Sequence, residues 1–172
     1  LVHRILGDIE YAKASLKVEN KKLNTGDPNV MRKTYADAED AYAKADEQLR
    51  RVFELNPKHF TAYAIMGYIE LQRANYFIVE TERKQRLLRS QDMSARCAEL
   101  APTDNPDAKF CRGNLAYAYE LTGNFEQSMT NWQSYLALDP KEPTCIQGFN
   151  RSYAGFATRA GGLRKYIEQI SA

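Results

Sequence analysis

The sequence has few cysteines, few histidines and no long apolar run. Its 172 residues include three cysteines and two histidines. No apolar stretch approaches the roughly 20 residues that a membrane-spanning helix needs, so we expect no insertion into a membrane. His3 and His59 lie far apart and in no metal-ligand spacing. Phosphate-binding glycine loops and nucleophile elbows are also missing, so we predict no enzyme, no metal and no cofactor.

Net charge is small as well. The chain has 24 lysines and arginines against 22 aspartates and glutamates, which gives a formal net charge of +2. A nucleic-acid-binding domain normally has a strongly basic face, so we predict no nucleic-acid partner. The hydrophobic fraction of 44% and the charged fraction of 27% are typical of a globular protein. A chain of this length can bury a core without disulfides or metals.

The three cysteines, Cys97, Cys111 and Cys145, form no recognisable disulfide framework. We expect them to be small buried hydrophobic residues on helices. A single bridge between Cys97 and Cys111 is the alternative if the protein folds outside the cytoplasm. Because the chain begins at Leu1 and not at a methionine, a removed leader or domain remains open, and so does the choice between cytoplasm and periplasm.

Strand patterns are equally scarce, since no segment alternates between apolar and polar residues over a strand length. Helix-forming residues dominate instead. The prolines lie near expected helix boundaries, where proline is tolerated. These prolines are Pro28, Pro57, Pro102, Pro106, Pro140 and Pro143. The sequence therefore predicts an all-α protein.

Three segments end alike, in leucine, one small or polar residue and proline. They are VFELNP at 52–57, CAELAP at 97–102 and YLALDP at 135–140. The final prolines of the first two segments are 45 residues apart, and those of the last two are 38 apart. Pro106 and Pro140 are 34 residues apart, which is about the length of one tetratricopeptide unit.

Residues 109–140 resemble a tetratricopeptide repeat. The matching positions are Leu115, Ala116, Tyr119, the Gly123-Asn124-Phe125 turn, Ser128, Trp132, Leu138 and Pro140. Arg112 stands where the family has a large apolar residue, and Tyr135 stands where it has a small alanine. Weaker copies lie on both sides of this segment, so the resemblance covers most of the chain.

The resemblance implies a right-handed stack of antiparallel helical hairpins with one or two elongated helices. We expect one domain over residues 1–172. Its expected parts are an N-terminal long-helix hairpin at 1–57, an elongated repeat at 58–102, the best-formed repeat at 107–140, and a C-terminal helix with a capping helix at 143–172. Gly161 and Gly162 are expected to break the chain between those last two helices.

Two segments are too long for the repeat. Residues 30–55 keep a heptad-like apolar spacing without a glycine, which predicts one long helix or a barely bent pair of helices. The spacing of 45 exceeds 34 by 11 residues, or about three helical turns. We therefore expect the helix within residues 75–100 to be three turns longer than usual. One side of it would hold Tyr76, Val79, Arg83, Leu87, Gln91, Ser94 and Cys97.

A basic run crosses the same segment. It consists of Arg83, Lys84, Arg86, Arg89 and Arg96, with Asp92 as the opposing charge. The plain interpretation is the solvated face of a long helix. The alternative is a contact with an acidic partner or an anionic lipid. The run lacks the interleaved aromatic residues that single-stranded nucleic acid requires.

The resemblance also implies a binding surface, since the first helix of each hairpin lines the concave side of such stacks. Carried onto this chain, the lining is aromatic and has few charges. It comprises Tyr68, Leu71, Gln72, Phe110, Asn114, Tyr117, Leu121, Gln147 and Arg151. The family's lysine and asparagine clamp for peptide carboxylates is absent, because Ala64 and Tyr68 stand at those positions. The alternative is that several of these tyrosines pack between the repeats.

We therefore predict a scaffold or adaptor that binds a peptide or a partner protein in an aromatic concave groove. One alternative is a spacer that forms homo-oligomers through its long helices. Another is a small-ligand-binding accessory subunit of a transport or enzyme complex. Exposed Tyr68 and Tyr117 would favour the groove. An apolar patch on residues 76–100 would favour the spacer, and an enclosed cavity would favour the accessory subunit.

Overall fold

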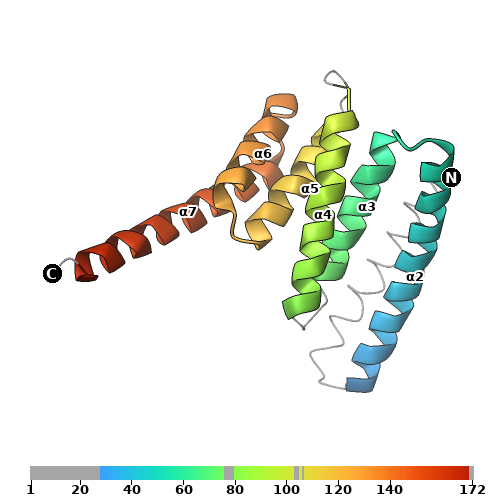
Figure 1. Ribbon diagram of the computed structural model, residues 1–172, viewed down its shortest axis with the longest axis horizontal. Coiled ribbons are helices and arrows are strands. Elements are labelled where there is room, and N and C mark those ends of the chain that lie inside the picture. Colours follow the sequence, from blue (N-terminus) through green and yellow to red (C-terminus); the bar gives the residue numbers. More distant parts are fainter. Residues whose placement is uncertain (1–27, 76–79, 103–104, 106, 171–172) are drawn as a thin grey trace. The chain divides into compact units, whose positions relative to one another are not determined.

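The computed structural model describes residues 28–75, 80–102, 105 and 107–170. These residues form six α-helices and no strand, which confirms the predicted all-α class (Figure 1). The helices are α2 (Pro28–Leu55), α3 (Phe60–Ala74), α4 (Glu80–Leu100), α5 (Ala108–Leu121), α6 (Phe125–Leu138) and α7 (Pro143–Ile170). The chain divides into two compact units between residues 62 and 63. Within the described part, no helix is both long and apolar enough to cross a membrane.

The first unit contains α2, a single helix of 28 residues, which confirms the long helix expected at 30–55. Its buried residues recur at intervals of three and four, as on one face of a helix. They are Tyr42, Ala45, Leu49 and Val52. The helix ends before Asn56 and Pro57, where proline removes a backbone donor and the Asn56 side chain accepts a hydrogen bond from the Lys58 amide.

In the second unit, α3 and α4 form a closely packed hairpin. The hydroxyl of Ser90 donates a hydrogen bond to the carbonyl oxygen of Gly67 over 2.8 Å. A Cβ atom on Gly67 would overlap the hydroxyl of Ser94. Small residues on both helices therefore allow the close approach. Of the side predicted for α4, Leu87, Ser94 and Cys97 are buried, Arg83 and Gln91 are half-buried, and Tyr76 and Val79 lie outside the described residues.

The α5–α6 hairpin repeats this contact. Ser128 donates a hydrogen bond to the carbonyl oxygen of Ala116, again over 2.8 Å. Gly123 closes the turn between the two helices with a φ of +75°, a conformation that glycine adopts without a steric penalty. The buried face of α6 is Ser128, Asn131, Trp132 and Tyr135.

The two serines occupy different positions along α4 and α6. Ser90 and Ser128 both lie ten residues before the last residue of their helices. Ser90, however, lies ten residues after the start of α4, whereas Ser128 lies three residues after the start of α6. In the part of the chain that the structure describes, the 21-residue α4 therefore exceeds the 14-residue α6 by seven residues before the serine. This is about two turns within the described residues. Residues 76–79, which precede Glu80, lie outside them, so the expected extension of three turns stays a prediction.

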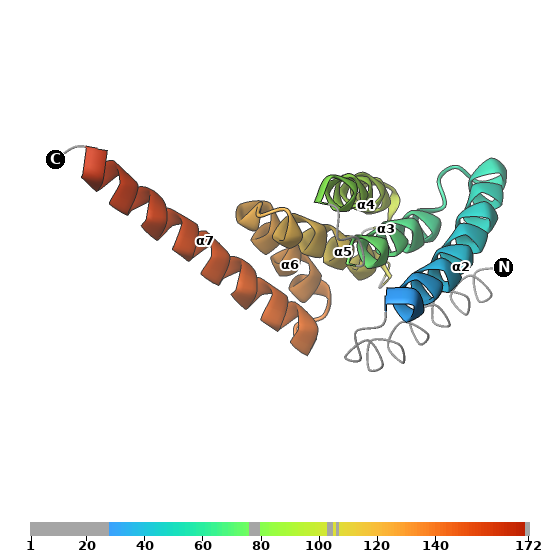
Figure 2. The ribbon, with the colours of Figure 1, turned by 90° about the horizontal axis from the view of Figure 1, so that it is seen from below.

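The last helix, α7, is continuous over 28 residues and passes through Gly161 and Gly162. The expected break and separate capping helix were therefore wrong. Glycine weakens a helix interior by only about 1 kcal/mol, which the hydrogen bonds of a long helix tolerate. Gly148 and Gly155 instead mark contacts, because they face the rings of Trp132 and Phe125. Beyond residue 157 the described side chains are exposed, and this half of α7 extends past α6 (Figure 2).

A disulfide joins α4 to α5. Cys97 and Cys111 are bonded with their Cα atoms 5.4 Å apart, and both residues are fully buried. Both cysteines are buried on helices, as expected, but they are bonded to each other, which is the alternative stated above. Cys145 is a buried free cysteine, as expected. The bridge therefore fastens the two hairpins to each other across their interface.

Candidate functional site

Part of the predicted groove holds α5 against α3. The side-chain amide of Asn114 donates a hydrogen bond to the carbonyl oxygen of Ala64 over 2.8 Å. On α3, Tyr68 and Gln72 are half-buried. Asn114 therefore links two of the helices that the prediction placed side by side, and its amide donor is already used within the protein.

Three further predicted residues come together at one core cluster. Leu71 is 2% exposed and belongs to the core with Leu87 and Ala118, whereas Tyr117 and Leu121 pack against that cluster and are half-buried. Tyr117 also packs against a second cluster, which contains Ala116, Trp132, Tyr135 and Cys145. Leu71 is thus a core residue, and Tyr117 joins the two clusters with part of its ring at the surface.

The link from α5 to α7 is ionic. The guanidinium of Arg151 donates to both carboxylate oxygens of Glu120, over 2.6 Å and 3.2 Å. The hydrogen bond with Glu120 raises the pKa of Arg151 above its usual value. Gln147 is exposed beside it on α7, and Phe110 is 50% exposed at the start of α5. The sequence prediction included Arg151 but missed Glu120, which precedes it by 31 residues.

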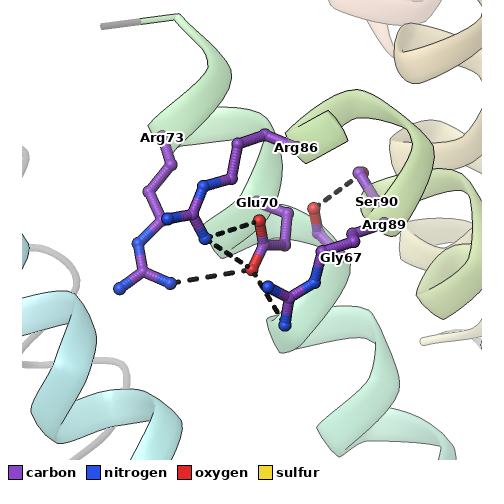
Figure 3. Close-up of polar contacts among 6 residues, drawn as sticks. All are labelled: Gly67, Glu70, Arg73, Arg86, Arg89 and Ser90. Atoms are coloured by element: carbon purple, nitrogen blue, oxygen red, sulfur yellow. Dashed lines mark hydrogen bonds and ion pairs between the residues drawn. The ribbon is translucent and has the colours of Figure 1, made fainter. Parts of the chain in front are cut away.

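A second group of polar residues surrounds Glu70, whose side chain is completely buried. Nη1 of Arg86 donates to both carboxylate oxygens of Glu70, over 3.2 Å and 3.1 Å. Arg73 and Arg89 each place a guanidinium nitrogen near Oε1, at 3.6 Å and 3.7 Å. Figure 3 shows the three arginines directed toward this one carboxylate. We call Glu70, Arg73, Arg86 and Arg89 the arginine cluster.

The two helices supply this cluster in matching pairs. Glu70 and Arg73 are three residues apart on α3, and Arg86 and Arg89 are three residues apart on α4, so each pair shares one helix face. Isolated burial of a carboxylate costs several kcal/mol, which the surrounding cations offset. The exposed fraction of the side chains rises from 5% for Arg73 to 23% for Arg86 and 61% for Arg89. The cluster therefore runs from the core to the surface.

At its exposed end the cluster borders a cavity of about 290 Å³. The lining side chains are Glu82, Gln85, Arg86 and Arg89. Their spacing of three, four and seven residues places them on one face of α4. All four lie in the first ten residues of α4, within or next to the part that has no counterpart in α6.

The remaining arginines of the basic run lie beside carboxylates of their own helix. Arg83 lies 3.7 Å from Glu80, and Arg96 lies 2.9 Å from Glu99. These contacts agree with the expected solvated face. Sequence reasoning included Arg86 and Arg89 in the run but missed Glu70, because a fully buried glutamate is rare and leaves no local signal.

A second cavity, of about 410 Å³, lies at the turn between α5 and α6 and against α7. It is lined by Gly123, Asn124, Phe125, Glu126, Phe156, Arg159 and Ala160. Arg159 donates a hydrogen bond to the Gly123 carbonyl oxygen over 3.2 Å. The lining residues come from the turn of the hairpin and from α7, and none of them belongs to the predicted groove.

Cys145 and Tyr135 are neighbouring buried groups with raised pKa values. Burial raises the pKa of the Cys145 thiol to about 11, and burial likewise raises the pKa of Tyr135. Both groups are therefore protonated near neutral pH, which disfavours a nucleophilic role for Cys145. Among residues 28–75, 80–102, 105 and 107–170, no three His, Cys, Asp or Glu side chains gather as a metal site would require.

The sequence matches no model of a known protein family and no curated protein at a significant level.

Proposed function

We propose that this protein is a tetratricopeptide-like scaffold that binds an extended peptide segment of a partner protein along α3, α5 and α7. The observation that carries the proposal is the pair of links between these helices, Asn114 to Ala64 and Arg151 to Glu120. They hold successive helices next to each other, with Tyr117 and Phe110 partly exposed on the middle one.

The repeated serine contact supports the comparison with hairpin repeats. The partners Gly67 and Ser90 are 23 residues apart, and Ala116 and Ser128 are 12 apart. The difference is eleven residues, equal to the excess of the 45-residue proline spacing over 34. An insertion of eleven residues in the α3–α4 hairpin, relative to the α5–α6 hairpin, accounts for the difference in contact spacing and for the excess in proline spacing.

The side chains along this surface suit a peptide. Phe110 and Tyr117 offer aromatic contact area at a small cost in side-chain entropy. Gln147 is exposed and has both a donor and an acceptor for a peptide backbone. The charges of Arg151 and Glu120 neutralise each other, so this pair gives the surface no net charge. An extended segment with apolar side chains therefore fits better than a highly charged one.

The proposal can be tested with peptides selected on the native protein from a random library. The double substitution Tyr68→Ala and Tyr117→Ala should weaken the selected peptides by roughly tenfold or more, since interface tyrosines often contribute strongly. Phe110→Ala, at a half-exposed position, should weaken them with less effect on the fold. Unchanged affinity in both folded variants would refute the groove.

Tyr153→Ala is the matched control for these variants. Tyr153 is 60% exposed on α7 and lies two residues after Arg151, on another side of the helix. It should leave the affinity unchanged. Circular dichroism and thermal melting of every variant separate loss of binding from loss of structure.

The spacer alternative requires an apolar patch on α4. Leu88 is 47% exposed there, but the residues one turn before and after it are Lys84, Gln85, Gln91 and Asp92. Leu88 is therefore a single exposed apolar side chain among polar ones, and it does not form the apolar patch that self-association would need. The accessory-subunit alternative requires a cavity in the groove, whereas the cavity beside Phe125 and Phe156 lies at the turn between α5 and α6.

The disulfide supports a location outside the cytoplasm. Disulfides persist in oxidising compartments, and cytosolic reductants keep most thiols reduced. Cys97 and Cys111 join two elements of the core and are fully buried, so the bridge has a structural position. We therefore propose that the scaffold works in the periplasm or another oxidising compartment.

A further inference from the structure

We propose that Arg86 and Arg89 form a second binding site, separate from the groove, which takes one carboxylate group from an acidic side chain of a protein partner. The site is the cavity of about 290 Å³ beside the arginine cluster. It does not depend on the groove, because none of its lining residues belongs to the predicted groove set.

Charge in the cavity fits a single carboxylate. Its lining residues comprise two arginines, one glutamate and one glutamine, so their formal sum is +1. A carboxylate neutralises that charge and can accept two parallel hydrogen bonds from a guanidinium. A phosphate dianion would exceed it and would also meet the carboxylate of Glu82. The Gln85 amide adds a neutral donor on the same face.

Glu70 positions the arginines for this role. It accepts two hydrogen bonds from Arg86 and lies 3.7 Å from Arg89, so both guanidinium groups are held on the same side. A flexible arginine loses side-chain entropy when it binds, and prior fixation reduces that loss. Arg89 is 61% exposed, so its guanidinium can be reached by a partner while it still faces Glu70.

A protein partner is favoured over a membrane surface. Recognition of anionic lipids by charge alone typically uses clusters of about 4–8 lysines and arginines. On α4, Arg83 and Arg96 lie beside Glu80 and Glu99 of their own helix, and only Arg86 and Arg89 line the cavity. A concave site with two arginines suits one side chain better than a flat layer of headgroups.

The test is an NMR titration of the full chain labelled with nitrogen-15. The probes are sodium acetate, a blocked Gly-Ala-Glu-Ala-Gly peptide, its glutamine counterpart and inorganic phosphate, all at constant ionic strength. The Arg86 and Arg89 Nε–H signals should shift to saturation with acetate and with the glutamate peptide. The glutamate peptide should bind more tightly than acetate, because a protein segment makes additional contacts. Equal affinity for the glutamine peptide, or tighter binding of phosphate, would overturn the proposal.

Three substitutions sharpen this test. Arg89→Ala should weaken the glutamate peptide by about tenfold, the usual scale for a lost charged hydrogen bond. Gln85→Glu should weaken it similarly by adding a negative charge, without removing an arginine. Arg96→Ala removes the same charge from the same helix outside the cavity and should change the affinity little. Equal losses in Arg89→Ala and Arg96→Ala would show nonspecific attraction and overturn the site.

Two further arms separate this site from its alternatives. Tyr117→Ala, which alters the groove, should leave the glutamate-peptide affinity unchanged; a parallel loss would overturn the independence of the two sites. Vesicles with 30% phosphatidylserine should not sediment the protein in an Arg89-dependent way. If they do, the carboxylate assignment fails in favour of lipid.

Discussion

The hydroxyl of Ser90 on α4 donates a 2.8 Å hydrogen bond to the carbonyl oxygen of Gly67 on α3. Ser128 and Ala116 make the same contact between α5 and α6. A buried serine that binds a helix carbonyl satisfies its own hydroxyl and needs only a small partner residue. The two hairpins thus share one serine-to-carbonyl hydrogen bond and differ in the length of helix that precedes the serine.

Gly148→Ala should destabilise the protein, because a Cβ atom there would lie 2.5 Å from the Trp132 ring. Overpacking of this kind costs about 1–3 kcal/mol. Gly161→Ala in the same helix is the control. It meets no atom within 4 Å, so it should stabilise α7 by about 0.5–1 kcal/mol. Urea unfolding of both variants gives the two free energies, and equal signs would contradict the packing described for Trp132.

Glu70→Gln should lower the free energy of unfolding by about 3–5 kcal/mol, because it leaves buried Arg73 without the carboxylate charge. Chemical denaturation measures the change. Glu99→Gln breaks an exposed pair with Arg96 on the same hairpin and should have little effect. A small effect at both positions would show that the arginine cluster does not depend on Glu70.

Replacement of both Cys97 and Cys111 by serine should lower the free energy of unfolding by about 3 kcal/mol, since the bridge closes a loop with a separation of 14 residues. Denaturant titration measures this change, with Cys145→Ala as the variant that keeps the bridge. Alkylation of the denatured protein gives a second readout. One modified cysteine is expected before reduction and three after it; three before reduction would exclude the bridge.

Stability should decline at alkaline pH. Burial raises the pKa of Cys145 from 9.0 to about 11, so the folded state keeps its proton where the unfolded chain loses it. The protonated Cys145 thiol therefore contributes its full share to the free energy of unfolding below pH 9 and loses it as the pH rises toward about 11. The loss is on the order of 2 kcal/mol for a shift of this size. Urea unfolding between these pH values measures the slope. In Cys145→Ala the decrease of the unfolding free energy with pH should be smaller. An unchanged slope would assign the pH dependence to another group.

Much of the fold follows from local patterns. The apolar spacing of Tyr42 to Val52 predicts the long α2, because it matches the helical period. Proline positions mark most helix boundaries, since proline cannot continue a hydrogen-bonded helix. Gly161 and Gly162 were misleading. Glycine is only a weak helix breaker, and the chain around this pair remained helical.

The candidate sites were only partly accessible from the sequence. The repeat pattern placed Tyr117 and Arg151 in the predicted groove, because the first helices of successive hairpins carry equivalent positions. It could not indicate that Leu71 enters the core, since its burial depends on Leu87 and Ala118 from other helices. Glu70 was also missed, because Arg86 and Arg89 come from a helix whose offset is altered by the insertion.

The sequence by itself determined the helical class, the long helix α2 and the eleven-residue excess, because these depend on periodicity and spacing along the chain. Tertiary structure alone decided that Cys97 reaches Cys111, that Arg86 and Arg89 meet Glu70, and that Gly148 faces Trp132. Each of these contacts joins separate helices. Their distances are set by how two surfaces pack, and a buried charge or a close glycine acquires its role only once the opposing helix is in place.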